Sequence, residues 1–230
     1  MLDMQIRKCT YTISHIHILT FQSHIRQIIS PYFSYEPLEY GIDNEGTLNE
    51  NIRIIFRNDG FLMQFNKETA TLMYEGPISE VRKSNAVVDI FFDIYQKIKG
   101  IDGFVKTTAH TMEADFVGFT NKQNHDESLV ANKLVTIPFP NVSEYASIME
   151  MSQNDSTIRL QFGNYNEKDI LKYNLSPLKT AYNEALKGNY GYIAQIRVTE
   201  ETIAPSFSKY KSLIAEAATT LGTYTDLLCQ

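Results

Sequence analysis

The sequence predicts an α+β protein, in which antiparallel sheets carry helices on one face. Two strand-like segments, 52–57 and 61–66, flank an Asn-Asp-Gly turn and therefore predict a hairpin. Helical apolar patterns cover residues 79–99 and 205–221. The 230 residues are 43 % hydrophobic and 21 % charged, which is an ordinary globular composition. No apolar run approaches the roughly 18 residues that would predict a membrane span.

Local patterns predict the elements of the first half. Residues 11–21 are rich in β-branched and aromatic side chains, which is typical of a strand. Residues 21–29 have apolar side chains at helical spacing, and Pro31 ends this helix. Ser79 is predicted to cap the long helix that stops at Gly100. Further strands are expected at 38–42, 69–74 and 104–119.

The second half begins after a polar, unpatterned stretch. Residues 121–133 are interpreted as a linker or surface loop, which divides the chain into 1–120 and 134–230. Ser143 is predicted to cap a short helix that runs to Met151. The remaining elements are expected to be a strand at 134–139, a hairpin of 157–162 and 169–175, a helix at 176–187, a strand at 190–198 and the final helix, which Gly222 is expected to interrupt.

Written as elements, both halves give the order strand, helix, hairpin, helix, strand. This is the βαββαβ pattern of a ferredoxin-like unit, so the sequence predicts two tandem ferredoxin-like halves followed by a C-terminal helix. The halves share the pattern without residue-level similarity. A single larger α+β domain is the alternative interpretation.

Charge and cysteine content restrict the partners and the compartment. Lys and Arg number 21 and Asp and Glu number 27, which gives a net charge of 21 − 27 = −6. An acidic chain without a basic run lacks the attraction to phosphate on which nucleic-acid binding depends. Two cysteines are too few for a secreted disulfide framework, and no signal peptide is visible. The sequence therefore predicts a cytoplasmic protein that binds neither membrane nor nucleic acid.

Three histidines form the one residue pattern in the sequence that could support catalysis. His15 and His17 are two residues apart on a predicted strand, so their rings share a face. His110 lies on the 104–119 strand, which a ferredoxin-like sheet places beside the first strand. Three imidazoles are suited to bind zinc or another transition metal. The favoured interpretation is still of half-buried sheet histidines, because His110 shares its face with Met112 and Ala114.

Aromatic residues are the other conspicuous feature. The chain has 14 tyrosines and 13 phenylalanines but no tryptophan. Exposed tyrosines offer a large contact area at low entropic cost and are common in binding surfaces. One cluster, including Phe33, follows the first predicted helix, and another lies in the second half. The candidate ligand-binding residues are Tyr32, Tyr35, Tyr40, Tyr190 and Tyr192; the alternative is that these rings cover the edges of the core.

These observations favour a non-catalytic binding or protein-interaction module that uses an open sheet face or the aromatic loops. Its partner, a protein or a small ligand, is not identified, and no cofactor is predicted. The apolar face of the last helix is interpreted as packing on its own sheet, and a homodimer interface on this face is the alternative. The first alternative is a metal- or histidine-dependent hydrolase centred on His15, His17 and His110. The second is an RNA-binding processing factor of the tandem ferredoxin-like type.

Overall fold

The structure is a computed structural model that describes residues 4–34, 39–76, 85–120, 146–153, 156–165, 190–201 and 206–229. Its elements are, in chain order, β1 (Met4–His15), α1 (Phe21–Ile29), the 3₁₀ helix η1 (Ser30–Ser34), β2 (Glu39–Asp43), β3 (Asn51–Phe56), β4 (Phe61–Phe65), β5 (Thr69–Glu75), α3 (Ala86–Lys99), β6 (Thr107–Thr120), β7 (Ala146–Gln153), β8 (Ser156–Tyr165), β9 (Tyr190–Glu201) and α6 (Phe207–Cys229). The α+β fold class is confirmed. No described helix is both long enough and apolar enough to cross a membrane.

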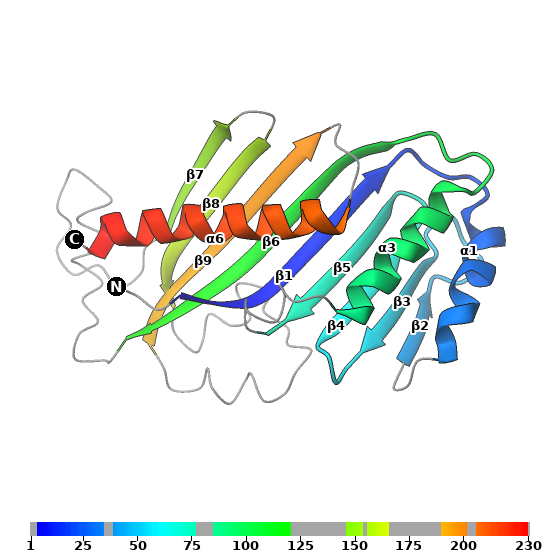
Figure 1. Cartoon of the computed structure of the whole chain (residues 1–230), viewed down its shortest axis with the longest axis horizontal. Coiled ribbons are helices and arrows are strands. Elements are labelled where there is room, and N and C mark those ends of the chain that lie inside the picture. Colours follow the sequence, from blue (N-terminus) through cyan, green and yellow to red (C-terminus); the bar gives the residue numbers. More distant parts are fainter. Residues whose placement is uncertain are drawn as a thin grey trace.

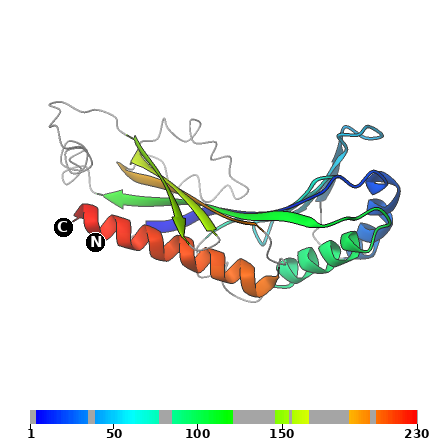
Figure 2. The ribbon, with the colours of Figure 1, turned by 90° about the horizontal axis from the view of Figure 1, so that it is seen from above.

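The nine described strands form one antiparallel sheet in the order β2-β3-β4-β5-β1-β6-β9-β8-β7 (Figure 1). Strands β1 and β6, which are the first and the last described strands of residues 1–120, lie at the centre of the sheet and pair with each other. The edges are β2 and β7. Helix α3 follows β5 and helix α6 follows β9. Figure 2 shows both helices on the same face of the curved sheet.

The predicted tandem ferredoxin-like repeat is not shown. A βαββαβ unit has two strands between its helices, whereas four described strands, β2 to β5, separate α1 from α3. One consequence of that expectation is nevertheless present, because β6 lies beside β1 with His110 opposite Ile13. The division of the chain into 1–120 and 134–230 stays a prediction.

The local sequence explains how the elements around the first half form. Helix α1 buries Phe21, Ile25 and Ile29, which recur every four residues along one face. Helix α3 is capped by Asn85, whose side chain accepts a 2.7 Å hydrogen bond from the backbone of Val87. The cap predicted at Ser79 lies outside the described residues.

The core lies between the sheet and the helices. Strand β1 alternates buried Cys9, Tyr11 and Ile13 with half-buried polar residues, so one face of the strand points to α3 and α6. The Tyr11 ring makes edge-to-face contacts with Phe91 of α3 and Tyr210 of α6, with centroids 6.3 and 5.5 Å apart. Both helices are therefore packed on the central strands.

Several predicted elements need correction. The helix predicted over 143–151 is wrong, because residues 146–153 pair with β8 as the edge strand β7. Helix α6 continues through Gly222 without interruption. Strand β1 ends at His15, since a turn precedes α1. The linker at 121–133, the strands at 134–139 and 169–175 and the helix at 176–187 lie outside the described residues.

Candidate functional site

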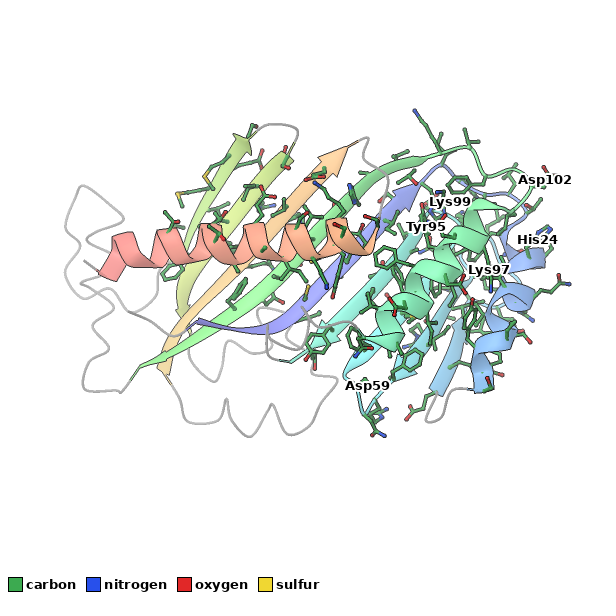
Figure 3. The ribbon with its side chains drawn as sticks, in the orientation of Figure 1. His24, Asp59, Tyr95, Lys97, Lys99 and Asp102 are labelled. Carbon is green, nitrogen blue, oxygen red and sulfur yellow. The ribbon has the colours of Figure 1, made fainter. Side chains whose placement is uncertain are left out.

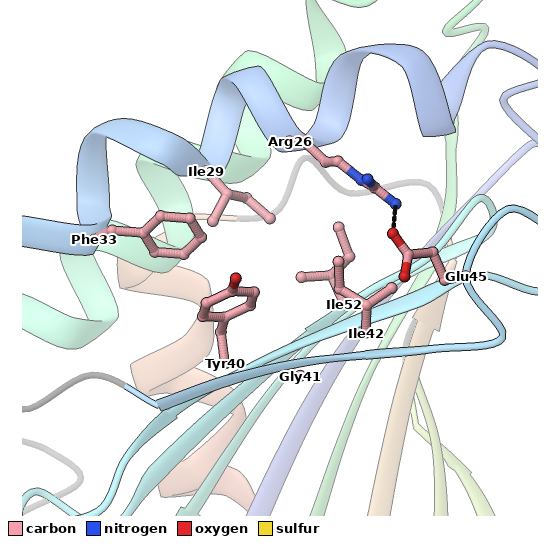
Figure 4. A pocket seen from close by; sticks show the side chains of 8 residues that line it. All are labelled: Arg26, Ile29, Phe33, Tyr40, Gly41, Ile42, Glu45 and Ile52. Carbon is pink, nitrogen blue, oxygen red and sulfur yellow. Dashed lines mark hydrogen bonds and ion pairs between the residues drawn. The ribbon is translucent and has the colours of Figure 1, made fainter.

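A cavity of about 490 Å³ lies between the α1–η1 segment and the edge strand β2 (Figure 4). Strand β2 is half-buried or exposed along its whole length, as expected for an edge. Its alternation turns Tyr40 and Ile42 toward the cavity. We call this space the β2 cavity; its lining residues are Arg26, Ile29, Phe33, Tyr40, Gly41, Ile42, Glu45 and Ile52.

One end of the β2 cavity is aromatic. The rings of Phe33 and Tyr40 are stacked, with centroids 4.9 Å apart and planes inclined by 27°. They remain 41 % and 59 % exposed, respectively, so their outer surfaces face solvent. Exposed aromatic rings at the mouth of a cavity supply contact area for a ligand.

The opposite end is charged. The Arg26 guanidinium donates to Glu45 at 2.9 Å and to Glu50 at 3.3 Å. Its hydrogen bond to Glu45 is the main reason that the pKa of Arg26 is raised. Glu50 is only 2 % exposed and accepts a second hydrogen bond, of 2.8 Å, from the backbone of Gly46. Among the described residues, its Oε1 atom has no hydrogen-bond partner. Two carboxylates thus share one guanidinium.

The structure separates the five candidate tyrosines. Tyr40 lines the β2 cavity. Tyr32 is buried, does not line the cavity and donates a hydrogen bond to Asp93 of α3. Lys97 of α3 lies 4.7 Å above the Tyr32 ring and 2.5 Å from its hydroxyl. Burial, followed by the bond to Asp93, raises the pKa of Tyr32. These contacts give Tyr32 a structural role.

The other three candidates do not join the site in the described structure. Tyr35 lies outside the described residues. Tyr190 and Tyr192 lie on β9, opposite Thr120 and Gly118 of β6. Strand β9 is six positions away from β2 in the sheet order, so these residues belong to a different part of the sheet.

A second hollow, of about 590 Å³, lies between α1 and the C-terminal end of α3. His24, Lys97 and Asp102 contribute to its walls (Figure 3). Its described lining contains no Phe or Tyr side chain, in contrast to that of the β2 cavity. We therefore treat the β2 cavity as the candidate site.

The three histidines of the hydrolase hypothesis have different surroundings. His15 packs against Tyr95 and Phe104, with ring centroids 6.1 and 5.8 Å away, and burial lowers its pKa to about 4. His17 is partly exposed, 3.7 Å from Glu68. No group of three or more His, Cys, Asp or Glu residues is placed to hold a metal within the described ranges.

His110 belongs to a buried polar network under α6. Its Nδ1 atom is 2.9 Å from the Tyr11 hydroxyl, and its Nε2 atom is 3.5 Å from Glu200. The other oxygen of Glu200 contacts Lys209 of α6 at 2.5 Å and Ser156 at 3.1 Å. Burial lowers the pKa of His110, and the Glu200 carboxylate opposes this shift. We interpret this network as the polar anchor of α6.

Sequence reasoning did not identify Arg26, Glu45 or Glu50 as site residues. They come from α1 and from the turn between β2 and β3, which the pairing of β2 with β3 brings under the helix. The only local signal was the turn-forming stretch around Gly46, where φ is +74°. No protein-family model matches the chain, and no curated protein matches it either.

Proposed function

We propose that the protein is a non-catalytic binding module that adds an extended peptide segment of a partner protein to the edge of β2. The observation that carries this proposal is the exposed Phe33–Tyr40 stack at a cavity beside an edge strand. The sequence predicted a binding module that uses an open sheet face or the aromatic loops; this proposal assigns the binding to one surface, the edge of β2 with the adjoining β2 cavity.

The edge strand supplies the main-chain part of such an interaction. An edge strand presents alternate N–H and C=O groups that an added strand can pair with. Strand β2 pairs with β3 on one side, from Glu39–Ile55 to Asp43–Asn51, and no described strand pairs with its other side. A segment of about five residues would match the length of β2.

The cavity supplies the side-chain part. Side chains of an added strand alternate between the two faces of the sheet. Those on the helix-bearing face would enter the space under η1, where Ile42 and Ile52 of the sheet and Ile29 of α1 line opposite sides (Figure 4). Main-chain pairing gives affinity in this mode of recognition, and the pocket for alternate side chains gives specificity.

The proposal is tested by selecting peptides from a random display library on the full chain and measuring their affinities by fluorescence anisotropy. Tyr40→Ala should weaken a selected peptide by about tenfold, the loss expected for one anchoring ring. Val105→Ala is the matched control, because Val105 is an apolar side chain 64 % exposed and outside the cavity. Equal effects of both variants, or no selected peptide, would contradict the proposal.

Strand addition makes a second, more specific prediction. Methylating a peptide nitrogen removes a donor, so methylation at alternate positions should abolish binding and methylation at the intervening positions should not. Binding that is insensitive to N-methylation, or sensitive at every position, would exclude an added strand.

The cytosolic location predicted from the sequence, and the homodimer that it raised as an alternative, remain part of this proposal. Light scattering on the purified full chain measures the mass in solution and decides between a monomer of 26.3 kDa and a dimer. A dimer that dissociates when a selected peptide is added would indicate that the peptide and the second copy of the chain bind the same edge of β2.

A further inference from the structure

We infer that the β2 cavity selects a cationic side chain, Lys or Arg, from the added peptide. This inference rests on the proposed strand addition and names the side chain that the cavity accepts. It follows from three features of the cavity: its charge balance, an unsatisfied buried acceptor behind it and the stacked rings at its mouth.

The charge balance favours a cation. Glu45 and Glu50 both contact Arg26, so the charged end carries two carboxylates and one guanidinium. An incoming ammonium or guanidinium group would complete a balanced set of two positive and two negative charges. An incoming carboxylate would instead find Arg26 already engaged by two acceptors and would add a third negative charge.

The buried carboxylate provides a second, independent indication. Glu50 is 2 % exposed, and its Oε1 atom lacks a hydrogen-bond partner among the described residues. A buried acceptor without a partner is costly, and groups left in this state in a native fold call for an explanation. If a cationic ligand binds Glu45, Arg26 is free to turn fully toward Glu50 and satisfy that carboxylate.

The aromatic pair suits the stem of such a side chain. Lys and Arg lay their methylene groups along apolar surface while the charged end reaches a polar site. The exposed faces of Phe33 and Tyr40 provide that surface for the methylene stem. Glu45, which is 62 % exposed, lies at the far end of the cavity, within reach of the solvent and of the ligand.

The first experiment replaces the cationic residue in a selected peptide by norleucine, which keeps an unbranched apolar stem and removes the charge. The affinity for the full chain should fall about tenfold, and the loss should shrink when NaCl is raised from about 0.05 M to about 0.5 M. Selection of peptides without Lys or Arg, whose binding still follows the alternating N-methylation pattern, would overturn this inference and leave the proposed function intact. Failure to select any peptide would overturn both.

The second experiment locates the effect. Glu45→Gln should reduce the difference between the lysine and norleucine peptides to within about twofold, since it removes the excess negative charge. Asp59→Asn is the matched control: it makes the same change in net charge on an exposed residue of the β3–β4 hairpin, outside the cavity (Figure 3). If Asp59→Asn acts as strongly as Glu45→Gln, the preference reflects overall charge and the cavity is not its source.

A third variant separates recognition from stability. Arg26→Gln raises the excess negative charge of the cavity, so the lysine peptide should bind more tightly, by several-fold, whereas loss of a merely structural ion pair would weaken binding. Circular dichroism must first show that this variant is folded, because among the described residues the Glu50 side chain then keeps only the backbone of Gly46 as a hydrogen-bond partner. If it does not fold, the Glu45→Gln result decides the question alone.

Discussion

His110 and Glu200 are direct cross-strand neighbours on β6 and β9, and their side chains meet in the protein interior with Nε2 and Oε2 3.5 Å apart. Both residues are almost completely buried. The same carboxylate receives Lys209 from α6. Lys209 therefore links α6 to the middle of the sheet through its ion pair with Glu200, which the β6–β9 register places opposite His110.

Glu200→Gln should lower the free energy of unfolding by about 3 kcal/mol, because it leaves Lys209 without its carboxylate and breaks a buried pair. Urea denaturation measures this change. Glu113→Gln is the control, since Glu113 pairs with Arg197 at the surface, where an ion pair contributes about 1 kcal/mol or less. Equal losses in the two variants would show that Glu200 is not the anchor of α6.

Part of this arrangement could be predicted from the sequence. The alternation along 104–119 correctly placed His110 on the same buried face as Met112 and Ala114, with Glu113 on the other. Its partner Glu200 could not be predicted, because their contact depends on the pairing of β6 with β9 across 90 residues of sequence. Strand register is a property of the assembled sheet and leaves little local signal.

Secondary-structure elements were likewise predicted correctly only where the local sequence signal was strong. The β3–β4 hairpin was predicted correctly, since its Asn-Asp-Gly turn is a strong local signal. Strand β7 was mistaken for a helix because the apolar residues Ile148, Met149 and Met151 fit either period over so short a window. Pairing with β8 decides the matter in favour of the strand. The β2 cavity likewise combines residues from α1 and the β2–β3 turn, which only the fold brings together.

Acidification should destabilise the protein through His15. Its pKa is 6.5 in the unfolded chain and about 4 in the buried site, so between these values the unfolded state binds more protons. The free energy of unfolding should therefore fall as the pH drops from about 6.5 to about 4, and His15 should cause no further loss below about pH 4. The total loss due to His15 is about 3 kcal/mol. His110, whose pKa is also lowered, acts in the same direction.

The measurement compares urea midpoints of the wild type and His15→Leu at about pH 7.5 and about pH 4.5. The variant should lose less stability on acidification than the wild type. Ile13→Val, a change at a buried position of the same strand without a titrating group, should shift both midpoints equally. Identical pH dependence in the wild type and His15→Leu would refute the role of His15.

Tyr32→Phe should lower stability by about 1 kcal/mol and leave peptide affinity unchanged. The substitution removes the hydroxyl that bonds to Asp93 and Lys97 but keeps the buried ring. Tyr32 does not line the β2 cavity, in contrast to Tyr40. Thermal unfolding and anisotropy on the same sample separate the two effects. A tenfold loss of affinity in Tyr32→Phe would mean that the ligand reaches behind η1.

The same substitution should have opposite effects at two glycines. Gly60 has φ +72° at the end of the β3–β4 turn, where its carbonyl accepts a 2.9 Å bond from Glu75, so Gly60→Ala should cost about 1 kcal/mol. Gly222 lies exposed within α6, and a Cβ atom added there would meet nothing within 4 Å. Gly222→Ala should therefore stabilise the protein by about 1 kcal/mol, since alanine is the better helix former. Urea denaturation of both variants decides the point. A loss of stability in Gly222→Ala would show that α6 does not continue through this position and would restore the interruption that the sequence suggested.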